Sequence, residues 1–161
     1  MRGQVTNELD VDVPVDDIWA VYGTPVLPTH IVQLQPDVFQ KVDFIHGNGG
    51  VGTILYVQLV PGAPEPRTWK EKFIKIDDEE RLKVIRMIEG GYLDLGFTLF
   101  EYNTQIIEKD AESCTIRSTT VFEVDEKFEA NAALINATSA YGLAKAVANY
   151  VIQKKAKACD V

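Results

Sequence analysis

The chain has 161 residues, 46% of them hydrophobic and 25% charged, and this length and composition predict a single folded domain spanning residues 1–161. The formal net charge of -8 argues against partners that require a basic face, so neither nucleic acid nor a membrane surface is expected. No apolar signal-peptide core and no membrane-length apolar run is found, which predicts a cytoplasmic protein. A monomer or weak dimer is expected.

The cysteines and histidines give no sign of a disulfide framework or a metal site. The sequence contains two cysteines, Cys114 and Cys159, and two histidines, His30 and His46. Neither pair has the spacing of a zinc site, and the cysteines do not form the pattern of a disulfide-rich scaffold. No metal is therefore expected.

The N-terminal part predicts a strand followed by two short helices. Apolar and acidic or polar residues alternate from Val5 to Val13, as in a half-buried strand. A proline ends this strand, and Val15–Trp19 begins a short helix with acidic residues near its N-terminus. Pro25 is expected to break it, and a second short helical piece ends before Pro36.

The middle of the chain predicts a series of strands. Their expected ranges are 38–45, 53–60, 69–76, 82–89, 93–107 and 114–124. Acidic residues at 77–80 form the turn of a hairpin. The glycine run Gly47–Gly52 is interpreted as a connection between strands, because it lacks the Gly-Lys-Ser/Thr of a phosphate loop and a strand follows it.

The C-terminal part predicts one long helix. Residues 127–157 contain no proline and many alanines. An apolar stripe at helical spacing is expected to face the sheet, formed by Leu134, Ala137, Tyr141, Ala144 and Ala148. The predicted fold class is α+β, with a curved antiparallel sheet wrapped around this helix. The small residues of the stripe predict a hollow between helix and sheet.

Three ionisable residues fall on strand faces that are otherwise apolar: Glu71, Lys83 and Glu101. Side chains alternate between the two faces of a strand, so Glu71 shares its face with Trp69 and Phe73. The apolar residues that share a face with Lys83 or Glu101 are Ile85, Met87, Leu95, Phe97 and Leu99. Perturbed charged groups gather at functional sites, although structural networks and bulges also produce this pattern.

The hairpin would bring two of these charges together. With a turn centred near Asp78, Lys83 lies opposite Phe73 and diagonal to Glu71. Diagonal neighbours are about 7–8 Å apart, so the two side chains can meet or hold a small molecule between them.

Several longer motifs point to a known family. They are the glycine run Gly47–Gly52, the stretches Lys70–Phe73 and Arg81–Lys83, and above all Met87–Gly96, which reads MIEGGYLDLG. Together they resemble the Bet v 1-like (pathogenesis-related class 10) plant proteins, and within these the norcoclaurine synthase branch. The chain is also similar to the norbelladine synthases. The resemblance covers nearly the whole chain.

The resemblance implies a seven-stranded sheet gripping the C-terminal helix, a large hydrophobic cavity, and no metal or organic cofactor. Norcoclaurine synthases condense dopamine with 4-hydroxyphenylacetaldehyde in a Pictet–Spengler reaction. Their lysine and glutamate correspond to Lys83 and Glu71. Two positions depart, because Trp69 stands where those enzymes carry a tyrosine and Glu101 where they carry an aspartate.

The expected function is therefore amine–aldehyde condensation in plant alkaloid biosynthesis. Lys83 is expected to be the proton donor, Glu71 the base, and Glu101 the group that holds the amine or a catechol hydroxyl. The residues expected to bind substrate are Trp69, Phe73, Phe97, Leu99 and Tyr141. Two alternatives remain open: a condensation that stops at the imine, as in norbelladine synthases, and a non-catalytic carrier of small plant metabolites.

Overall fold

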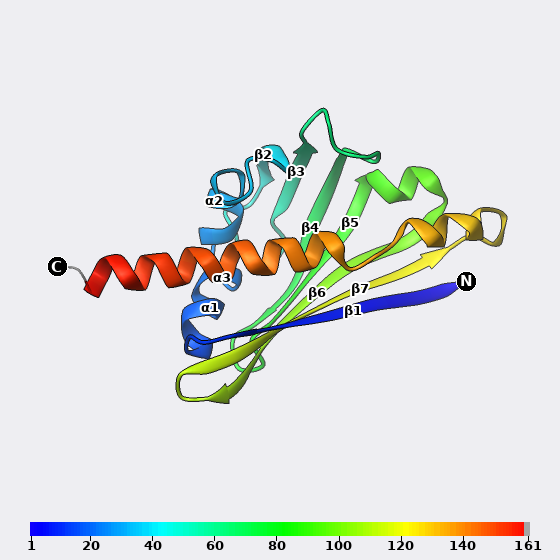
Figure 1. Cartoon of the computed structure of the whole chain (residues 1–161). Coiled ribbons are helices and arrows are strands. Elements are labelled where there is room, and N and C mark those ends of the chain that lie inside the picture. The colour runs from blue at the N-terminus through cyan, green and yellow to red at the C-terminus, as the bar shows by residue number, and fades with distance from the viewer. Residues whose placement is uncertain (160–161) are drawn as a thin grey trace.

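The computed structural model describes residues 1–159, which form one antiparallel sheet with α-helices and short 3₁₀ helices around it (Figure 1). The strands are β1 (Arg2–Val11), β2 (Phe39–His46), β3 (Ile54–Leu59), β4 (Thr68–Asp77), β5 (Leu82–Gly90), β6 (Phe97–Asp110) and β7 (Ser113–Val124). The helices are α1 (Val15–Tyr22), α2 (Val26–Leu34), α3 (Thr138–Cys159) and the 3₁₀ helices η1 (Gly91–Leu95) and η2 (Glu126–Leu134).

The sheet has seven strands in the order β1-β7-β6-β5-β4-β3-β2, so only β1 breaks the sequential order, by pairing with the last strand. In Figure 1, α3 runs across the concave side of the sheet, while α1 and α2 lie together at one end of it. The predicted α+β fold, with a curved antiparallel sheet around a C-terminal helix, is confirmed.

The strand predicted at 93–107 begins later than expected. Residues Gly91–Leu95 form η1, and β6 starts only at Phe97. Gly90, with φ of 70°, and Gly96, with φ of 91°, lie in the left-handed region on either side of this helix. Glycine adopts this conformation without the clash that a Cβ causes, so the chain can turn sharply at both ends of η1.

The single long helix predicted at 127–157 is interrupted. Residues 126–134 form η2, Ile135 is extended, and α3 begins at Thr138. The Asn136 side chain accepts a hydrogen bond of 2.9 Å from the backbone N–H of Thr138, the first residue of α3. A side-chain acceptor at this place satisfies a free N–H and favours a new helix start. Alanine content alone could not reveal this break.

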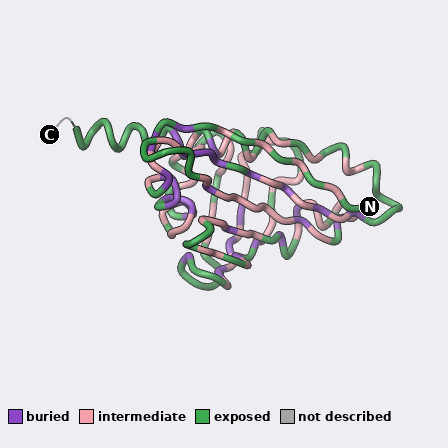
Figure 2. Tube along the Cα trace, turned by 90° about the horizontal axis from the view of Figure 1, so that it is seen from below, coloured by how far each residue is buried: buried purple, intermediate pink, exposed green. Residues whose placement is uncertain are grey.

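The buried face of α3 also differs from the predicted stripe. Ala144 and Ala148 are buried as expected, but the other buried residues of this face are Val147 and Val151. Leu134 lies in η2 and Tyr141 lies on α3, and both are exposed. The break before α3 separates Leu134 from the helical periodicity on which the stripe was based. Figure 2 shows the C-terminal turns of α3 exposed and extending away from the sheet.

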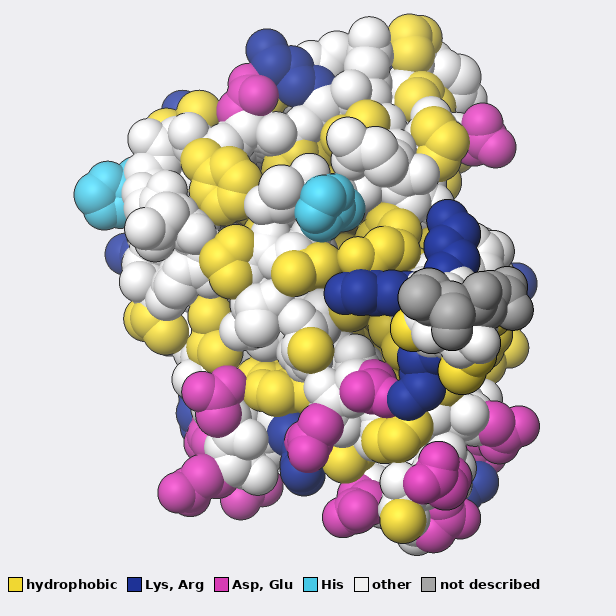
Figure 3. All heavy atoms as spheres, turned by 90° about the vertical axis from the view of Figure 1, so that its left-hand side faces the viewer, with side chains coloured by type: hydrophobic (Ala, Val, Ile, Leu, Met, Phe, Trp, Pro, Cys, Tyr) yellow, Lys and Arg dark blue, Asp and Glu magenta, His cyan; other side chains and the backbone are white. Residues whose placement is uncertain are grey.

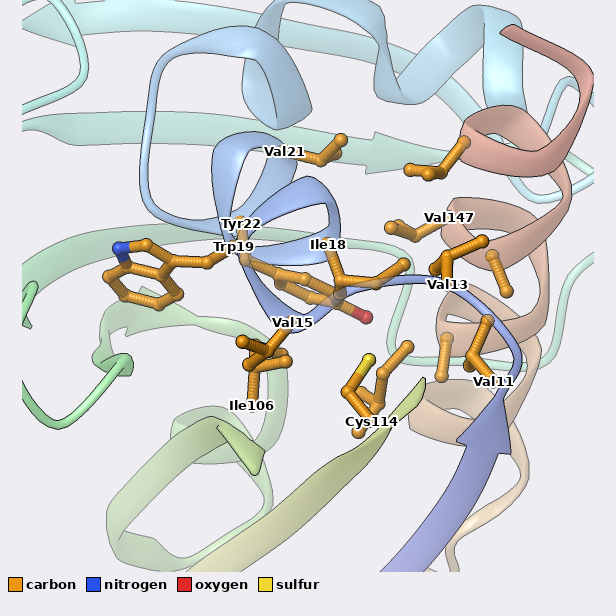
Figure 4. Close-up of a cluster of buried hydrophobic side chains, with 14 of the residues drawn as sticks. Val11, Val13, Val15, Ile18, Trp19, Val21, Tyr22, Ile106, Cys114 and Val147 are labelled. Carbon is orange, nitrogen blue, oxygen red and sulfur yellow. The ribbon is translucent and has the colours of Figure 1, made fainter. Parts of the chain in front are cut away.

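The apolar core is divided into separate clusters. The largest joins α1 and α3 to the sheet and includes Ile18, Tyr22, Ile106 and Val147 (Figure 4). A second cluster, rich in phenylalanine, lies below η1 and contains Phe97, Phe100 and Phe122. A third lies on β3 and β4 around Leu55, Val57 and Phe73. The space between these clusters is the cavity described next.

Candidate active site

A cavity of about 570 Å³ lies between the concave face of the sheet, the helices α1 and α2, and the N-terminal part of α3. Its walls are mainly apolar, and its polar lining is concentrated on the inner faces of β4 to β7. The lining side chains that bear on the chemistry are Tyr22, Trp69, Glu71, Phe73, Lys83, Tyr92, Tyr102, Thr104, Ser118 and Thr120. The cavity therefore holds two opposite charges inside a largely apolar enclosure.

Lys83 is buried in this cavity, with 2% of its surface exposed. Its Nζ donates a hydrogen bond of 3.0 Å to the carbonyl oxygen of Tyr22, the last residue of α1, and lies 4.0 Å from the ring centroid of Phe73. A carbonyl at a helix C-terminus lacks a helical partner and carries partial negative charge, so it is a natural acceptor for an ammonium group. Burial lowers the pKa of Lys83 to about 8, against the opposing effect of the Glu71 charge.

Glu71 lies on the same side of the sheet and is 9% exposed. Its Oε1 accepts a hydrogen bond of 2.8 Å from the indole Nε1 of Trp69. Burial raises the pKa of Glu71, while this hydrogen bond and the Lys83 charge act in the opposite direction. The site thus combines an ammonium that can release a proton near neutral pH with a carboxylate whose affinity for a proton is increased.

The hairpin register differs from the predicted one, because the turn is centred between Glu79 and Glu80 and not near Asp78. Phe73 pairs with Ile85, and Lys83 pairs with Ile76. The prediction that Lys83 lies opposite Phe73 is therefore wrong. The register shifts between Phe73 and Lys75, where one extra residue of β4 is accommodated. Both Phe73 and Lys83 still face the interior, and the long lysine side chain reaches back over the phenylalanine ring.

Glu101 does not face the cavity, and its predicted place there is wrong. A second register shift, between Phe97 and Leu99, inserts one extra residue into β6 and inverts the alternation beyond it. Glu101 pairs in the ladder with Arg86 and makes an ion pair of 3.4 Å with it on the opposite face of the sheet. The residue of β6 that faces the cavity at this level is Tyr102.

Three of the expected substrate-binding residues also lie outside the cavity lining. Phe97 is buried in the phenylalanine-rich cluster, in edge-to-face contact with Phe100 and Phe122. Leu99 is only partly buried and precedes Phe100, which takes the inward position after the bulge. Tyr141 is 38% exposed on α3. Trp69 and Phe73 do line the cavity, beside Glu71 and Lys83.

A row of hydroxyl-bearing residues on the cavity floor was missed. Lys83, Thr104 and Ser118 pair side by side across β5, β6 and β7, and Tyr102 pairs with Thr120 in the neighbouring row. Ser118 and Thr120 are buried, with 6% and 5% exposure, and line the cavity. Strand alternation could have found Ser118 and Thr120, because they share a face with Ile116 and Phe122. Tyr102 was hidden by the bulge.

Among residues 1–159 there is neither a candidate metal site nor a helix that could span a membrane. Residues 1–159 contain no group of three His, Cys, Asp or Glu residues that could hold a metal ion, and the histidine side chains seen in Figure 3 lie apart from each other. No helix in the same range is long and apolar enough to cross a membrane.

Comparison with known proteins identifies relatives of the whole chain. Residues 1–154 match the pathogenesis-related protein Bet v 1 family. S-norcoclaurine synthase 2 of Papaver somniferum is 42% identical over 157 residues, which cover 96% of this chain and 68% of that protein. Norbelladine synthase of Narcissus pseudonarcissus is 41% identical over 161 residues, covering 100% of this chain and 98% of that protein.

Comparison with solved structures also finds norcoclaurine synthases among the similar proteins. A Thalictrum flavum norcoclaurine synthase point mutant in complex with a transition-state analogue superposes with a TM-score of 0.90 at 41% identity, covering 96% of this chain and 97% of that one. The norcoclaurine synthase of the same plant in complex with dopamine and hydroxybenzaldehyde superposes with a TM-score of 0.88 at 40% identity, covering 95% and 88%.

Proposed function

The chain belongs to the pathogenesis-related protein Bet v 1 family, and on that basis we propose that it is an enzyme that condenses an aromatic amine with an aldehyde in its internal cavity. The observation that carries the proposal is the presence of Lys83 and Glu71 as buried, oppositely charged groups in one apolar cavity. Burying an unpaired charge costs several kcal/mol of stability. A carrier without catalytic activity would therefore gain nothing from keeping both Lys83 and Glu71 buried.

Lys83 acts in the first half of the proposed reaction. The amine nitrogen attacks the aldehyde carbon and forms a carbinolamine. The Lys83 ammonium donates a proton to the carbinolamine hydroxyl, the C–O bond breaks, and water leaves with formation of an iminium ion. With its pKa lowered to about 8, Lys83 is a stronger acid than an exposed lysine but still carries its proton at neutral pH.

Glu71 acts in the second half. A ring carbon of the amine attacks the iminium carbon, and a new C–C bond closes a second ring. The proton left on that ring carbon passes to a Glu71 carboxylate oxygen, and the C–H electrons restore aromaticity. Burial increases the affinity of Glu71 for this proton. Return of this proton from Glu71 to Lys83 restores both groups. The sum is then amine plus aldehyde giving a cyclic amine plus water, which requires no external oxidant, reductant or cofactor.

The cavity floor favours substrates with hydroxylated rings. Thr104, Ser118 and Thr120 provide hydroxyl groups that can both donate and accept hydrogen bonds beside Lys83. A phenol or catechol ring could exchange hydrogen bonds with these hydroxyl groups, whereas an unsubstituted ring could not. Dopamine-like amines are therefore the proposed substrate class.

A second candidate is condensation that stops at the imine. It is favoured by the similarity to norbelladine synthase, which extends over the whole chain. It would use Lys83 in the same way but would not require Glu71 to deprotonate a ring carbon.

Product analysis distinguishes these functions. The protein is incubated with dopamine and a panel of aldehydes, and products are separated on a chiral column against protein-free controls. Cyclised product enriched in one enantiomer supports the proposed function, and accelerated formation of linear imine supports the second candidate. Saturable binding without acceleration of either product would mean that the protein is a carrier.

A further inference from the structure

The carboxylate of Glu71 is held from one side by Trp69. The two residues are separated by one position on β4, so their side chains project from the same face into the cavity. The indole Nε1 donates to Oε1 at 2.8 Å, and within residues 1–159 this is the one hydrogen bond made by the Glu71 side chain. Oε2 is therefore the oxygen left without a protein donor.

We propose that Trp69 is a positioning residue for Glu71. The Trp69 indole N–H fixes Oε1 of Glu71 and leaves Oε2 as the atom that accepts the substrate's ring proton. The inference rests on the proposed function, since it assigns a role within the cyclisation step. It also gives a physical meaning to the tryptophan at this position, where the resemblance leads one to expect a tyrosine.

The donor matters because burial works against an ionised carboxylate. A protonated Glu71 cannot accept another proton, and burial raises its pKa. The titratable groups that act on it are Lys83 on the adjacent strand β5 and Tyr102 on β6, the strand beyond β5, while Tyr92 on η1 lines the same cavity. Lys83 acts on Glu71 through its charge, and the phenol of Tyr102 stays neutral because burial raises its pKa. Trp69 is the group in direct contact, so its N–H supports the ionised form most locally.

The hydrogen bond also suits the proton transfer itself. Before transfer, Oε1 accepts from the indole and Oε2 carries a free lone pair. The ring C–H bond then breaks, its proton binds Oε2, and its electrons return to the aromatic ring. The indole keeps its own proton throughout, so Trp69 positions Glu71 without taking part in the chemistry. A neutral acid is a weaker acceptor than a carboxylate, so the bond favours return of Glu71 to the ionised form.

The chain offers a matched control for removal of this donor. Trp19 on α1 donates through its Nε1 to Asp78 Oδ1 at 2.9 Å, outside the cavity lining. Figure 4 shows its indole nitrogen directed away from the other labelled core side chains. Trp69→Phe and Trp19→Phe each replace tryptophan with phenylalanine and each remove one indole–carboxylate hydrogen bond. Only the first removes it from Glu71.

The direct test measures Glu71 in the ligand-free protein. The side-chain carboxyl carbon of Glu71 is followed by NMR during a pH titration, with Glu71→Gln used for assignment. The Glu71 pKa is expected to be higher in Trp69→Phe than in the wild type, and unchanged in Trp19→Phe. An unchanged value in Trp69→Phe overturns the proposal. Trp69→Leu also lacks the donor and replaces Trp69→Phe should that variant not fold.

Kinetics supply the second readout. In Trp69→Phe the cyclisation rate near neutral pH is expected to fall about ten-fold, the order expected for loss of a hydrogen bond to a charged group. The fall of the cyclisation rate at acidic pH, which reports protonation of Glu71, should move to higher pH in this variant. Added to Glu71→Gln, Trp69→Phe should cause little further loss, whereas additive losses would mean that Trp69 is only a cavity wall. A pKa shift in a protein that cyclises nothing would support the positioning of Glu71 while overturning the proposed function.

Discussion

Glu71 and Lys83 are two charges in one enclosure, and each alters the acidity of the other. Burial raises the pKa of the carboxyl and lowers that of the ammonium, while their mutual attraction opposes both shifts. A low-dielectric enclosure makes such groups more effective at the moment of proton transfer than they would be in water. The same burial costs stability, because each charge loses its contact with water. Variants that change one residue at a time separate the role of each charge.

The Glu71→Gln variant separates the two halves of the reaction. The amide keeps an oxygen for the Trp69 hydrogen bond but cannot take a proton from a ring carbon. Imine formation should change little, while cyclisation should fall by about 10²–10⁴-fold, the usual contribution of a general base. Borohydride trapping of the imine and chromatography of the cyclised product measure the two steps. Equal losses in both steps would contradict the assigned role.

The Glu101→Gln variant tests the corrected orientation of β6. Glu101 makes an ion pair with Arg86 on the face of the sheet opposite the cavity. Substitutions at partly exposed positions away from the cavity usually change stability little. The rate of product formation should therefore stay within roughly two-fold of the wild type. A loss comparable with that of Glu71→Gln would mean that Glu101 reaches the cavity after all.

At the scale of elements, the break before α3 forms one wall of the cavity. Asn136 lines the cavity and accepts the hydrogen bond from the N–H of Thr138 that begins α3. The side chain of Asn7 donates a hydrogen bond of 2.8 Å to the carbonyl oxygen of Ala137, which ties the same turn to β1. These bonds position the start of α3 over the sheet.

The Asn136→Ala variant should therefore destabilise the protein by about 1 kcal/mol, as expected for loss of a side-chain acceptor at a helix start. Asn149→Ala is the matched control, since Asn149 is exposed in the middle of α3, where alanine is the better helix former. Urea denaturation of both variants measures the difference. Equal stability of the two variants would mean that the break does not depend on Asn136.

Sequence patterns predicted most elements because alternation and proline or glycine punctuation are local properties. They identified Glu71 and Lys83 as inward-facing for the same reason. Glu101 and Tyr102 were exchanged because a β-bulge depends on how two strands pair, which one strand does not encode. The α3 break was missed because it depends on two asparagine side chains that contact backbone groups, one of them across 130 positions of sequence. The cavity itself depends on how separate clusters pack.

At the scale of the whole molecule, burial of Lys83 links stability to pH. The folded pKa of about 8 is lower than the value of roughly 10.4 in an unfolded chain. Between these values the unfolded state binds the proton and the folded state does not, so this group makes stability increase as pH rises. The full effect is on the order of 3 kcal/mol.

The Lys83→Met variant should lack this pH-dependent contribution to stability. Its unfolding free energy relative to the wild type should therefore decrease as pH rises from about 8 to about 10.4. Urea denaturation at several pH values measures the difference, which removes contributions common to both proteins. A difference that does not change with pH would mean that the lysine titrates normally in the folded state.

The most direct test of the central claim is the rate of stereochemically enriched product formation by Lys83→Met at pH 7. Methionine keeps an unbranched apolar side chain but removes the ammonium, while Lys72→Met makes the same change at an exposed position of β4. Lys83→Met is expected to lose about 10²–10⁴-fold of the rate while remaining folded, and Lys72→Met to retain it. A Lys83→Met protein that condenses amine and aldehyde at the wild-type rate would contradict the account, because the buried lysine would then be only a structural partner of Glu71.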